Sequence, residues 1–265
     1  MIVETATRGL SRIGRSVFTL LEFSGFTIML FFTSVGFFKN IITRRREIVR
    51  QMYNAGARTF SVITVVALFT GMILTLQTGV ALRDYNMEEN IGNVVIATLT
   101  REMGPFTAAI ILIAAVGSAM AAELGTMKVS EEIDALQVMS ISPEDYLVMP
   151  RLVALAIMLP VATIYVNALG VIGGAIIARS HLGISFGTFY LHVLESLWFK
   201  PAYVGLLKSF VFGIVISVIS CAHGLRATDG ARGVGRATRN SVVASFLMVL
   251  IVGYYITDIF FREGP

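Results

Sequence analysis

The sequence has little charge for its length. Asp, Glu, Lys and Arg make up 14% of its 265 residues, while 55% of the residues are hydrophobic. A typical soluble domain has about 25% charged residues, so an ordinary soluble protein is excluded. The net charge of +4 does not indicate nucleic-acid binding, because the basic residues stand in short segments beside apolar runs, as membrane orientation produces.

Several kinds of chemistry are also missing. The one cysteine, Cys221, has no partner for an internal disulfide. His181, His192 and His223 lie in separate segments without ligand spacing, so no metal site is predicted. No nucleophile, base and acid occur in a catalytic arrangement, and no cofactor is expected. The sequence therefore predicts a protein that is not an enzyme.

A nucleotide-binding loop is absent as well. No segment reads G-x-x-x-x-G-K-[ST], and the nearest one, residues 230–237, lacks both the lysine and the hydroxyl that follows it. We interpret residues 230–237 as a flexible cytoplasmic turn between two helices. Any ATP hydrolysis linked to this chain is expected in a separate subunit.

What the sequence does contain is a series of long uncharged runs. A bilayer core of about 30 Å needs about 20 helical residues, and runs of this length recur between charged residues. We predict an all-α integral membrane protein with a single domain over 1–265. Its five-span bundle occupies residues 59–261, with spans over 59–82, 102–122, 152–178, 201–224 and 240–261.

Positive charge predicts the orientation of these spans. Segments 39–58 and 225–239 carry six and four Lys or Arg, whereas segments 83–101 and 179–200 carry two each. Basic loops stay on the cytoplasmic side, so the first two segments face the cytoplasm and the other two face outward. Segment 123–151 is then cytoplasmic, and the C-terminus lies outside.

The N-terminal residues 1–58 are interpreted separately. Residues 16–38 are apolar, but basic residues flank them on both sides, and both flanks favour the cytoplasm. We therefore predict an interfacial or elbow helix here, followed by a cytoplasmic connector, rather than a sixth span. The N-terminus is then cytoplasmic.

The cytoplasmic segment after the second span contains a short amphipathic helix pattern at about 126–140. Ser130 is a candidate N-cap, and three acids suit the first turn that follows it. Apolar positions recur at helical spacing: Ile133, Leu136 and Met139 or Gln137. Anionic headgroups attract basic helices, not acidic ones, so this helix is better explained as a contact with a soluble partner, an ATPase being the obvious candidate.

Charged residues also stand within the predicted spans. Lys208 lies about two turns into the fourth span, where a charge is costly and usually functional, although a lysine can also snorkel to the surface. A functional Lys208 is expected to bind a lipid phosphate or to pair with Glu102. Glu102 and Arg101 stand at the outer start of the second span, just before Pro105. Glu102 could organise both cations or accept a bond from an ethanolamine ammonium.

Small residues predict where helices approach closely. Gly170 and Gly174 form a GxxxG pair in the third span, and alanines fill the second. We attribute both features to packing within the subunit rather than to a dimer interface. Leu74 and Tyr85 are candidates for contact with acyl chains by position only.

A series of motifs, in order along nearly the whole chain, resembles the MlaE/YrbE family of permeases. They are Arg50-Gln-Met-Tyr53 with Gly56, Gly71-Met72 with Leu76-Gln77, Glu102-Met-Gly-Pro105, Ala122-Glu123-Leu-Gly125, Ser130-Glu131-Glu132-Ile133, Lys208-Ser209 with Phe212, and Ala237-Thr238 with Val242-Val243. One departure lies in the last span, where Gly253-Tyr-Tyr-Ile occupies a stretch in which the family commonly has an Asp. Asp258 comes later and is expected at the outer interface.

The resemblance implies a phospholipid ABC transporter of the MCE type. Such a permease is a homodimer in the inner membrane of Gram-negative bacteria, or in related plastid membranes. It binds two cytoplasmic ABC ATPase subunits and a periplasmic hexamer of MCE-domain protein, and in some members a STAS-domain subunit is added. The complex moves phospholipid between the inner and outer membranes and maintains the lipid asymmetry of the outer membrane.

The resemblance also favours two sets of site residues. Arg101, Glu102 and Lys208 are expected at the lipid site. The helix at about 126–140 is expected to be the coupling helix, and the residues assigned to ATPase coupling are Glu123, Lys128, Glu131, Glu132, Leu136 and Met139.

Two other functions remain open. An ion-coupled secondary transporter could use Glu102 and Lys208 as a relay, although the sequence shows no inverted repeat and no pair of broken helices. A non-transporting membrane anchor for a periplasmic lipid-binding complex would leave the charged residues of the spans unexplained.

Overall fold

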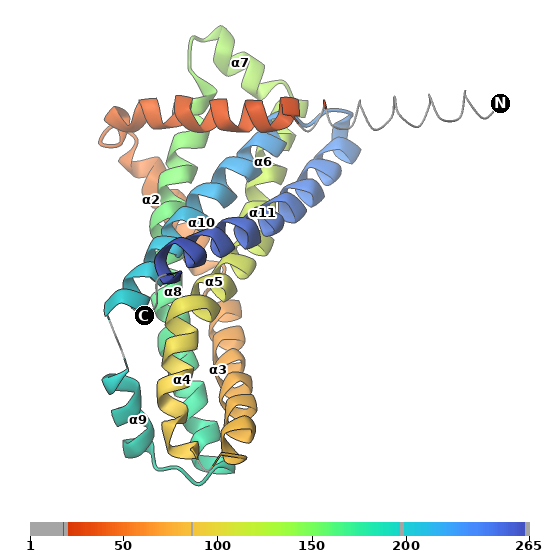
Figure 1. Ribbon diagram of the computed structural model, residues 1–265. Coiled ribbons are helices and arrows are strands. Elements are labelled where there is room, and N and C mark those ends of the chain that lie inside the picture. Colours follow the sequence, from red (N-terminus) through yellow and green to blue (C-terminus); the bar gives the residue numbers. More distant parts are fainter. Residues whose placement is uncertain (1–17, 19–20, 86, 197–198, 263–265) are drawn as a thin grey trace, which may run out of the picture.

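The computed structural model describes residues 18, 21–85, 87–196 and 199–262 (Figure 1). Over these residues the regular structure is entirely helical. A helix over residues 21–36 is followed by α2 (Arg45–Ala57), α3 (Phe60–Arg83), α4 (Ile91–Thr98), α5 (Gly104–Leu112), α6 (Ser118–Val129), α7 (Glu132–Val138), α8 (Met149–His181), α9 (Phe186–Glu195), α10 (Phe199–Leu225) and α11 (Gly230–Phe261).

Six helical segments of the described chain are long and apolar enough to cross a membrane. They are Leu21–Asn40, Phe60–Arg83, Ile91–Val129, Glu144–His181, Phe199–Leu225 and Gly230–Phe261. The prediction of an all-α membrane protein is confirmed. Five of the segments correspond to the predicted spans, and the sixth is the N-terminal apolar segment, of which residues 16, 17, 19 and 20 lie outside the described residues.

Every span after the first is longer than predicted, and the second differs most. The second runs over Ile91–Val129, 39 residues instead of the predicted 102–122. At 1.5 Å per residue this rod is about 58 Å long, nearly twice the thickness of a ~30 Å bilayer core. The prediction was wrong because it ended each span at a charged residue, whereas Arg101, Glu102 and Glu123 lie inside this helix.

Residues 230–237, predicted to be a flexible turn, instead form the first two turns of α11. The chain enters the helix through two residues with positive φ, Asp229 at 63° and Gly230 at 62°. Gly233 then packs against the backbone of Thr228 so closely that no Cβ fits between them. The glycines tighten the entry to the helix, and the prediction was wrong because it treated them as signs of a loop.

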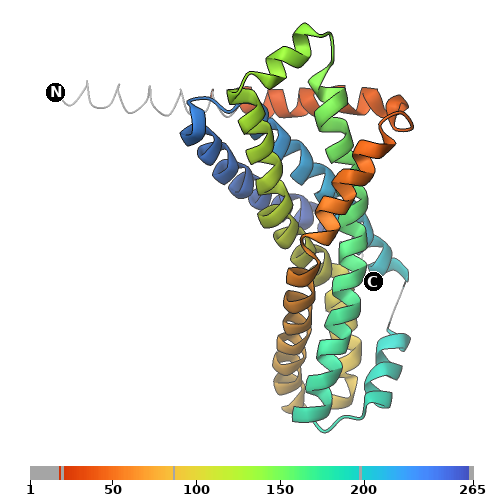
Figure 2. The ribbon, with the colours of Figure 1, turned by 180° about the vertical axis from the view of Figure 1, so that it is seen from behind.

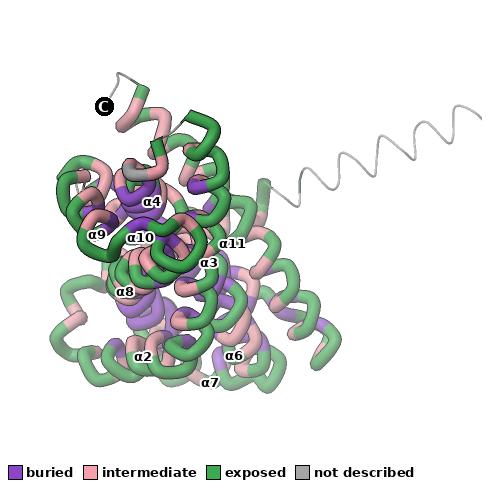
Figure 3. Tube along the Cα trace, turned by 90° about the horizontal axis from the view of Figure 1, so that it is seen from below, coloured by how far each residue is buried: buried purple, intermediate pink, exposed green. Residues whose placement is uncertain are grey.

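Helix α8 is the central element of the bundle. It packs against α2, α3, α5 and α10, and Figure 2 shows α2 and α3 lying end to end beside it. In Figure 3 the buried segments are concentrated around α4, α8 and α10. The N-terminal helix and α11 are the least covered, since only 11% of the most apolar stretch of each is buried. These two helices therefore leave the most surface for lipid or for another chain.

The connecting segments sort to two ends of the molecule. Figure 1 shows α7, the N-terminal helix and the start of α11 at one end, and α9 with the turn between α3 and α4 at the other. The N-terminal helix runs across the bundle and its end is anchored by Asp145, which accepts hydrogen bonds from Asn40 at 2.9 Å and from Arg44 at 2.8 Å. This sorting agrees with the alternation that the basic residues predicted.

Glycines allow the closest helix contacts. A Cβ on Gly71 of α3 would coincide with the carbonyl group of Gly170 in α8, and one on Gly173 would meet the carbonyl of Leu68. A Cβ on Gly174 would also meet side chains of this same chain. The prediction that the Gly170 and Gly174 pair packs within the subunit is confirmed.

Gly71→Ala tests this contact. The added methyl group has no room against the α8 backbone, so the two helices must separate, at a cost of about 1–3 kcal/mol. We expect the melting temperature of the detergent-purified protein to fall by several degrees. Gly25→Ala in the N-terminal helix is the matched control, because a Cβ there meets nothing within 4 Å. Equal melting temperatures for the two variants would contradict the packing described.

Candidate functional site

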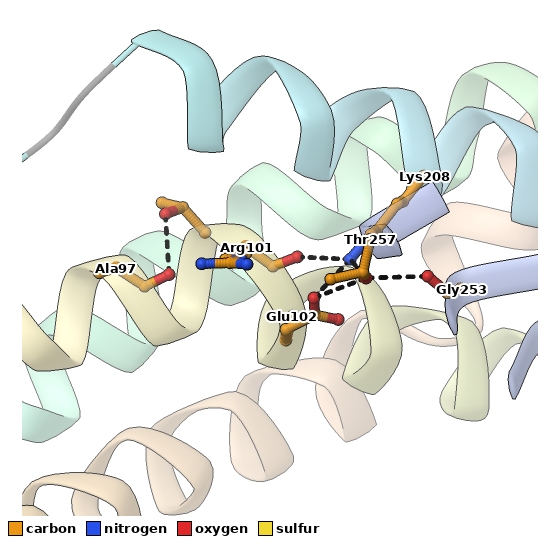
Figure 4. A network of polar contacts seen from close by, with 7 residues as sticks. Ala97, Arg101, Glu102, Lys208, Gly253 and Thr257 are labelled. Carbon is orange, nitrogen blue, oxygen red and sulfur yellow. Dashed lines mark hydrogen bonds and ion pairs between the residues drawn. The ribbon is translucent and has the colours of Figure 1, made fainter. Parts of the chain in front are cut away.

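Lys208 is a buried cation with all three donors occupied. It is 1% exposed, so the interpretation that it snorkels to the surface is wrong. Its Nζ donates to Oε1 of Glu102 at 2.6 Å, to Oγ1 of Thr257 at 2.6 Å and to the carbonyl oxygen of Arg101 at 3.1 Å (Figure 4). The predicted pairing of Lys208 with Glu102 is confirmed. A lysine ammonium has three N–H groups, so none remains for a ligand in this arrangement.

Thr257 completes the network and was not predicted. Its hydroxyl accepts from Lys208 and lies 2.8 Å from Oε1 of Glu102 and 2.9 Å from the carbonyl oxygen of Gly253. With one hydrogen, it can donate to only one of these two acceptors at a time. The sequence offered one weak signal, a hydroxyl residue one helical turn after Gly253 in an apolar helix. We call Lys208, Glu102, Thr257 and the Arg101 carbonyl the Lys208 network.

The backbone of the second span presents two members of this network. Residues Leu99–Met103 form a π-helical turn, a feature that is rare and frequently found at functional sites. Pro105 follows in the first turn of α5 and has no N–H to donate to the carbonyl of Arg101, four residues earlier. Lys208 binds that carbonyl instead, so the proline makes an acceptor available to a buried cation.

Close approach of α10 brings Lys208 to this turn. Gly205, three residues before Lys208, lies against the carbonyl oxygen of Thr100, with no space for a Cβ. Thr257 reaches the same Lys208 ammonium group from a third helix, α11. The Lys208 network therefore joins the second span, α10 and α11 at one point.

Arg101 is directed away from the Lys208 network. Its guanidinium carbon lies 3.5 Å from the centroid of the Phe261 ring, which is a cation–π contact. Over the part of the chain that the structure describes, its guanidinium makes no ion pair with a carboxylate. Arg101 thus keeps its donors for an anion, which Lys208 does not.

A cleft of about 90 Å³ opens beside the network. Its polar side is formed by Glu102 and Lys208, and its apolar walls are formed by Phe106, Phe212, Val249, Leu250, Gly253 and Tyr254. The side chain of Glu102 is 41% exposed, so the carboxylate remains accessible from the protein surface while one of its oxygens binds Lys208. A cleft of this size accommodates a small polar group next to an apolar wall, not a whole phospholipid.

The two residues predicted from position alone do not join this cleft. Leu74 is half-buried and packs against the cluster of α4, α8 and α9 that contains Phe189. Tyr85 is 74% exposed just beyond the end of α3. Neither is among the residues that line the cleft.

The residues predicted for ATPase coupling gather around α7, but the helix is shorter than the predicted 126–140. Helix α6 continues to Val129, and α7 covers Glu132–Val138. Glu131, at a φ of 60°, occupies the N-cap position, so Ser130 makes no capping bond and its predicted role was wrong. Ser140, beyond the other end of α7, also has positive φ, at 59°.

Ion pairs hold the surroundings of α7. Glu123 of α6 lies 3.2 Å from the buried Arg151 of α8, and Lys128 lies 2.7 Å from Asp134. Glu131 and Glu132 are exposed. These four predicted residues therefore split into two that are paired within the subunit and two that face outward.

The apolar residues of α7 divide in the same way. Ile133 is buried, and Leu136 packs half-buried against the same cluster, which includes Leu124 of α6. Met139 is 61% exposed, and Val138 is 86% exposed. Sequence reasoning missed Val138. It could have been noticed as an apolar residue at a helix position off the face that Ile133 and Leu136 share.

Together these features define a polytopic helical membrane protein with a polar site among its candidate spans. Residues 48–259 match the family described as Permease MlaE. The chain is 37% identical over 215 residues to a probable ABC transporter permease protein of Rickettsia typhi, covering 81% of this chain and 83% of that one. It belongs to the MlaE permease family, as the motifs indicated, and is a transporter permease subunit.

Two further relatives extend the comparison. A probable ABC transporter permease protein of Synechocystis is 37% identical over 221 residues, with 82% of this chain and 83% of that chain covered. The intermembrane phospholipid transport system permease protein MlaE of Haemophilus influenzae is 32% identical over 218 residues, with 82% and 84% covered.

Thr257→Val tests the Lys208 network. The change keeps the shape of the side chain but removes one of the three acceptors of a buried ammonium, so we expect a loss of about 1–3 kcal/mol and a lower melting temperature in detergent. Thr257→Ser keeps the hydroxyl and should stay close to the parent protein. If Thr257→Val loses no more stability than Thr257→Ser, the hydroxyl group contributes nothing to the Lys208 network and the role given to Thr257 is contradicted.

Proposed function

We propose that this chain is the transmembrane subunit of an ATP-driven transporter that moves phospholipid between the inner and outer membranes of a bacterium and so maintains the lipid asymmetry of the outer membrane. The main support is the cleft whose polar side is formed by Glu102 and Lys208, set among apolar walls in a permease of this family. The name of the Haemophilus influenzae relative supports phospholipid as the substrate.

In this proposal the three charged residues have different roles. Arg101 binds the lipid phosphate, because its guanidinium has free donors and guanidinium groups bind phosphate oxygens in pairs. Lys208 is a positioning residue that holds Glu102 and Thr257 in place. The exposed edge of Glu102 accepts a hydrogen bond from an ammonium headgroup. Leu74 and Tyr85 contact acyl chains on the outer half of the molecule.

Helix α7 is the proposed coupling helix. Its outer surface carries Glu131, Glu132, Val138 and Met139, while Ile133 and Leu136 hold it on the bundle. Val138 and Met139, at 86% and 61% exposure, form an exposed apolar surface on a helix that also carries acids, which suits a protein partner better than anionic lipid. The ABC ATPase therefore binds here, on the cytoplasmic side, and Glu123 and Lys128 support the helix through their ion pairs.

The same orientation places the remaining partners. The N-terminal helix lies as an elbow on the cytoplasmic face of the inner membrane, tied down by an ion pair of 2.6 Å between Glu22 and Arg226. The opposite end, with α9, and the C-terminus face the periplasm, where the family resemblance implies a hexamer of MCE-domain protein. A homodimer, and in some complexes a STAS-domain subunit, follow from the same resemblance.

Co-purification tests the proposal. The chain is expressed with the ATPase encoded beside it and purified through a tag on this chain. We expect the ATPase in a one-to-one ratio. A clean absence of ATPase from a folded, membrane-inserted preparation would favour the secondary-transporter and anchor alternatives.

Val138→Asp tests the surface of α7. A charge in a desolvated contact should weaken binding at least about tenfold, as for interface positions at which truncation costs 2 kcal/mol or more. The measurement is recovery of the ATPase in the same purification. Val138→Leu keeps the apolar contact and should retain the ATPase, whereas Leu136→Asp is unsuitable because Leu136 is half-buried. Full recovery with Val138→Asp would remove α7 from the interface.

Arg101→Gln and Lys208→Met separate binding from positioning. Arg101→Gln should lower phospholipid transport by reconstituted complex about tenfold and leave the melting temperature nearly unchanged, because the loss is confined to a charge-assisted hydrogen bond with the ligand. Lys208→Met should lower both quantities, because it dismantles the Lys208 network. Transport at the parent rate in Arg101→Gln would show that this arginine does not bind the substrate.

A further inference from the structure

A second charged surface lies at the opposite end of α11 from Thr257. Five residues line an open groove there: Asp229, Arg232, Gly235, Arg236 and Arg239. The four helical residues are spaced by three or four positions and so share one face of the helix. The other face is buried, with Gly233, Ala237 and Ser241 turned toward the bundle. We call the surface the arginine groove.

The arginine groove has more positive charge than its own acid neutralises. Arg236 pairs with Asp229, which leaves Arg232 and Arg239, both exposed, without an ion pair among the described residues. Between them, a Cβ on Gly235 would meet no atom within 4 Å, so the floor of the groove is open. Guanidinium groups around an open floor are suited to the oxygens of a phosphate.

The same face of α11 is apolar further along the helix. Val243 and Leu250, at 54% and 43% exposure, continue the spacing that begins with Arg239. Arg239 and Leu250 are 11 residues apart (250 − 239), or about 16 Å at 1.5 Å per residue, which is close to half of a ~30 Å bilayer core. Leu250 also lines the cleft of Glu102 and Lys208. One helix face therefore joins a basic groove, an apolar surface and the candidate lipid site.

The position of the groove suits the headgroup layer. Figure 1 shows the start of α11 at the same end as the N-terminal helix, which lies across the bundle. That helix exposes Met29 at 71% and Phe32 at 67%, as a helix embedded in the surface of a bilayer does. The arginine groove thus lies near the level at which lipid phosphates are found.

We propose that the arginine groove binds the phosphate of an anionic phospholipid in the cytoplasmic leaflet, with the acyl chains along Val243 and Leu250. An acidic protein surface is the competing occupant. The lipid is favoured because an apolar strip leads away from the groove on the same helix face, which acyl chains can cover and an acidic protein surface cannot. The site does not depend on ATP-driven transport, since it needs only this chain and a membrane.

Native mass spectrometry of the full-length chain in neutral detergent tests the proposal, with phosphatidylglycerol or phosphatidylcholine added. The parent protein should retain phosphatidylglycerol in preference to phosphatidylcholine. The combined variant Arg232→Gln, Arg236→Gln and Arg239→Gln should retain about tenfold less phosphatidylglycerol. The matched control removes the same charge from exposed positions of α2, through Arg45→Gln, Arg46→Gln and Arg50→Gln, and should bind as the parent does.

Gly235→Leu provides an independent test without a change of charge. It fills the floor of the groove from an exposed helix position, so it should reduce phosphatidylglycerol binding while the protein stays folded. Equal retention in all variants would overturn the proposal. Loss of ATPase from the arginine variant with unchanged lipid binding would assign the groove to a protein partner instead. None of these outcomes depends on transport activity, so failure here leaves the proposed function standing.

Discussion

A buried ammonium needs three hydrogen-bond acceptors, and much of this structure follows from that need. Removing a charge from water is costly unless it is paired and fully hydrogen-bonded. Lys208 is paired by Glu102, and its other two acceptors come from the backbone of the second span and from α11. The π-helical turn at Leu99–Met103, the proline at 105 and the glycine at 205 are each explained as means of bringing these acceptors within reach.

The second span, which contributes to the Lys208 network, also connects two distant parts of the proposed mechanism. The second span is one helical rod from Ile91 to Val129, with Glu102 and its cleft in the first half and α7 just beyond its end. Glu123, in the same rod, pairs with Arg151 of α8. A rod with fixed partners at both positions provides a continuous physical connection between an ATPase at α7 and a lipid at Arg101. Its second π-helical turn, Ile113–Gly117, lies between them.

Sequence reasoning found those features that a membrane makes conspicuous. Lys208 and Glu102 stood out because charges are rare within apolar helices, and their pairing was one of the two roles expected of Lys208. Thr257 did not stand out, because a threonine in an apolar helix usually bonds its own backbone. The rule that charges end a span misplaced both ends of the second span, since Arg101 and Glu123 lie inside it. The glycines before Arg236 were taken for a loop, although they allow the tight entry of α11.

The central claim is that ATP hydrolysis by a partner subunit moves phospholipid through this chain. It is tested most directly by reconstituting the chain with its ATPase in vesicles that contain a fluorescent phospholipid, and by measuring transfer with ATP, with a non-hydrolysable analogue, and with an ion gradient alone. The account predicts transfer only with hydrolysable ATP. Transfer driven by the gradient in the absence of ATP would contradict it and establish a secondary transporter.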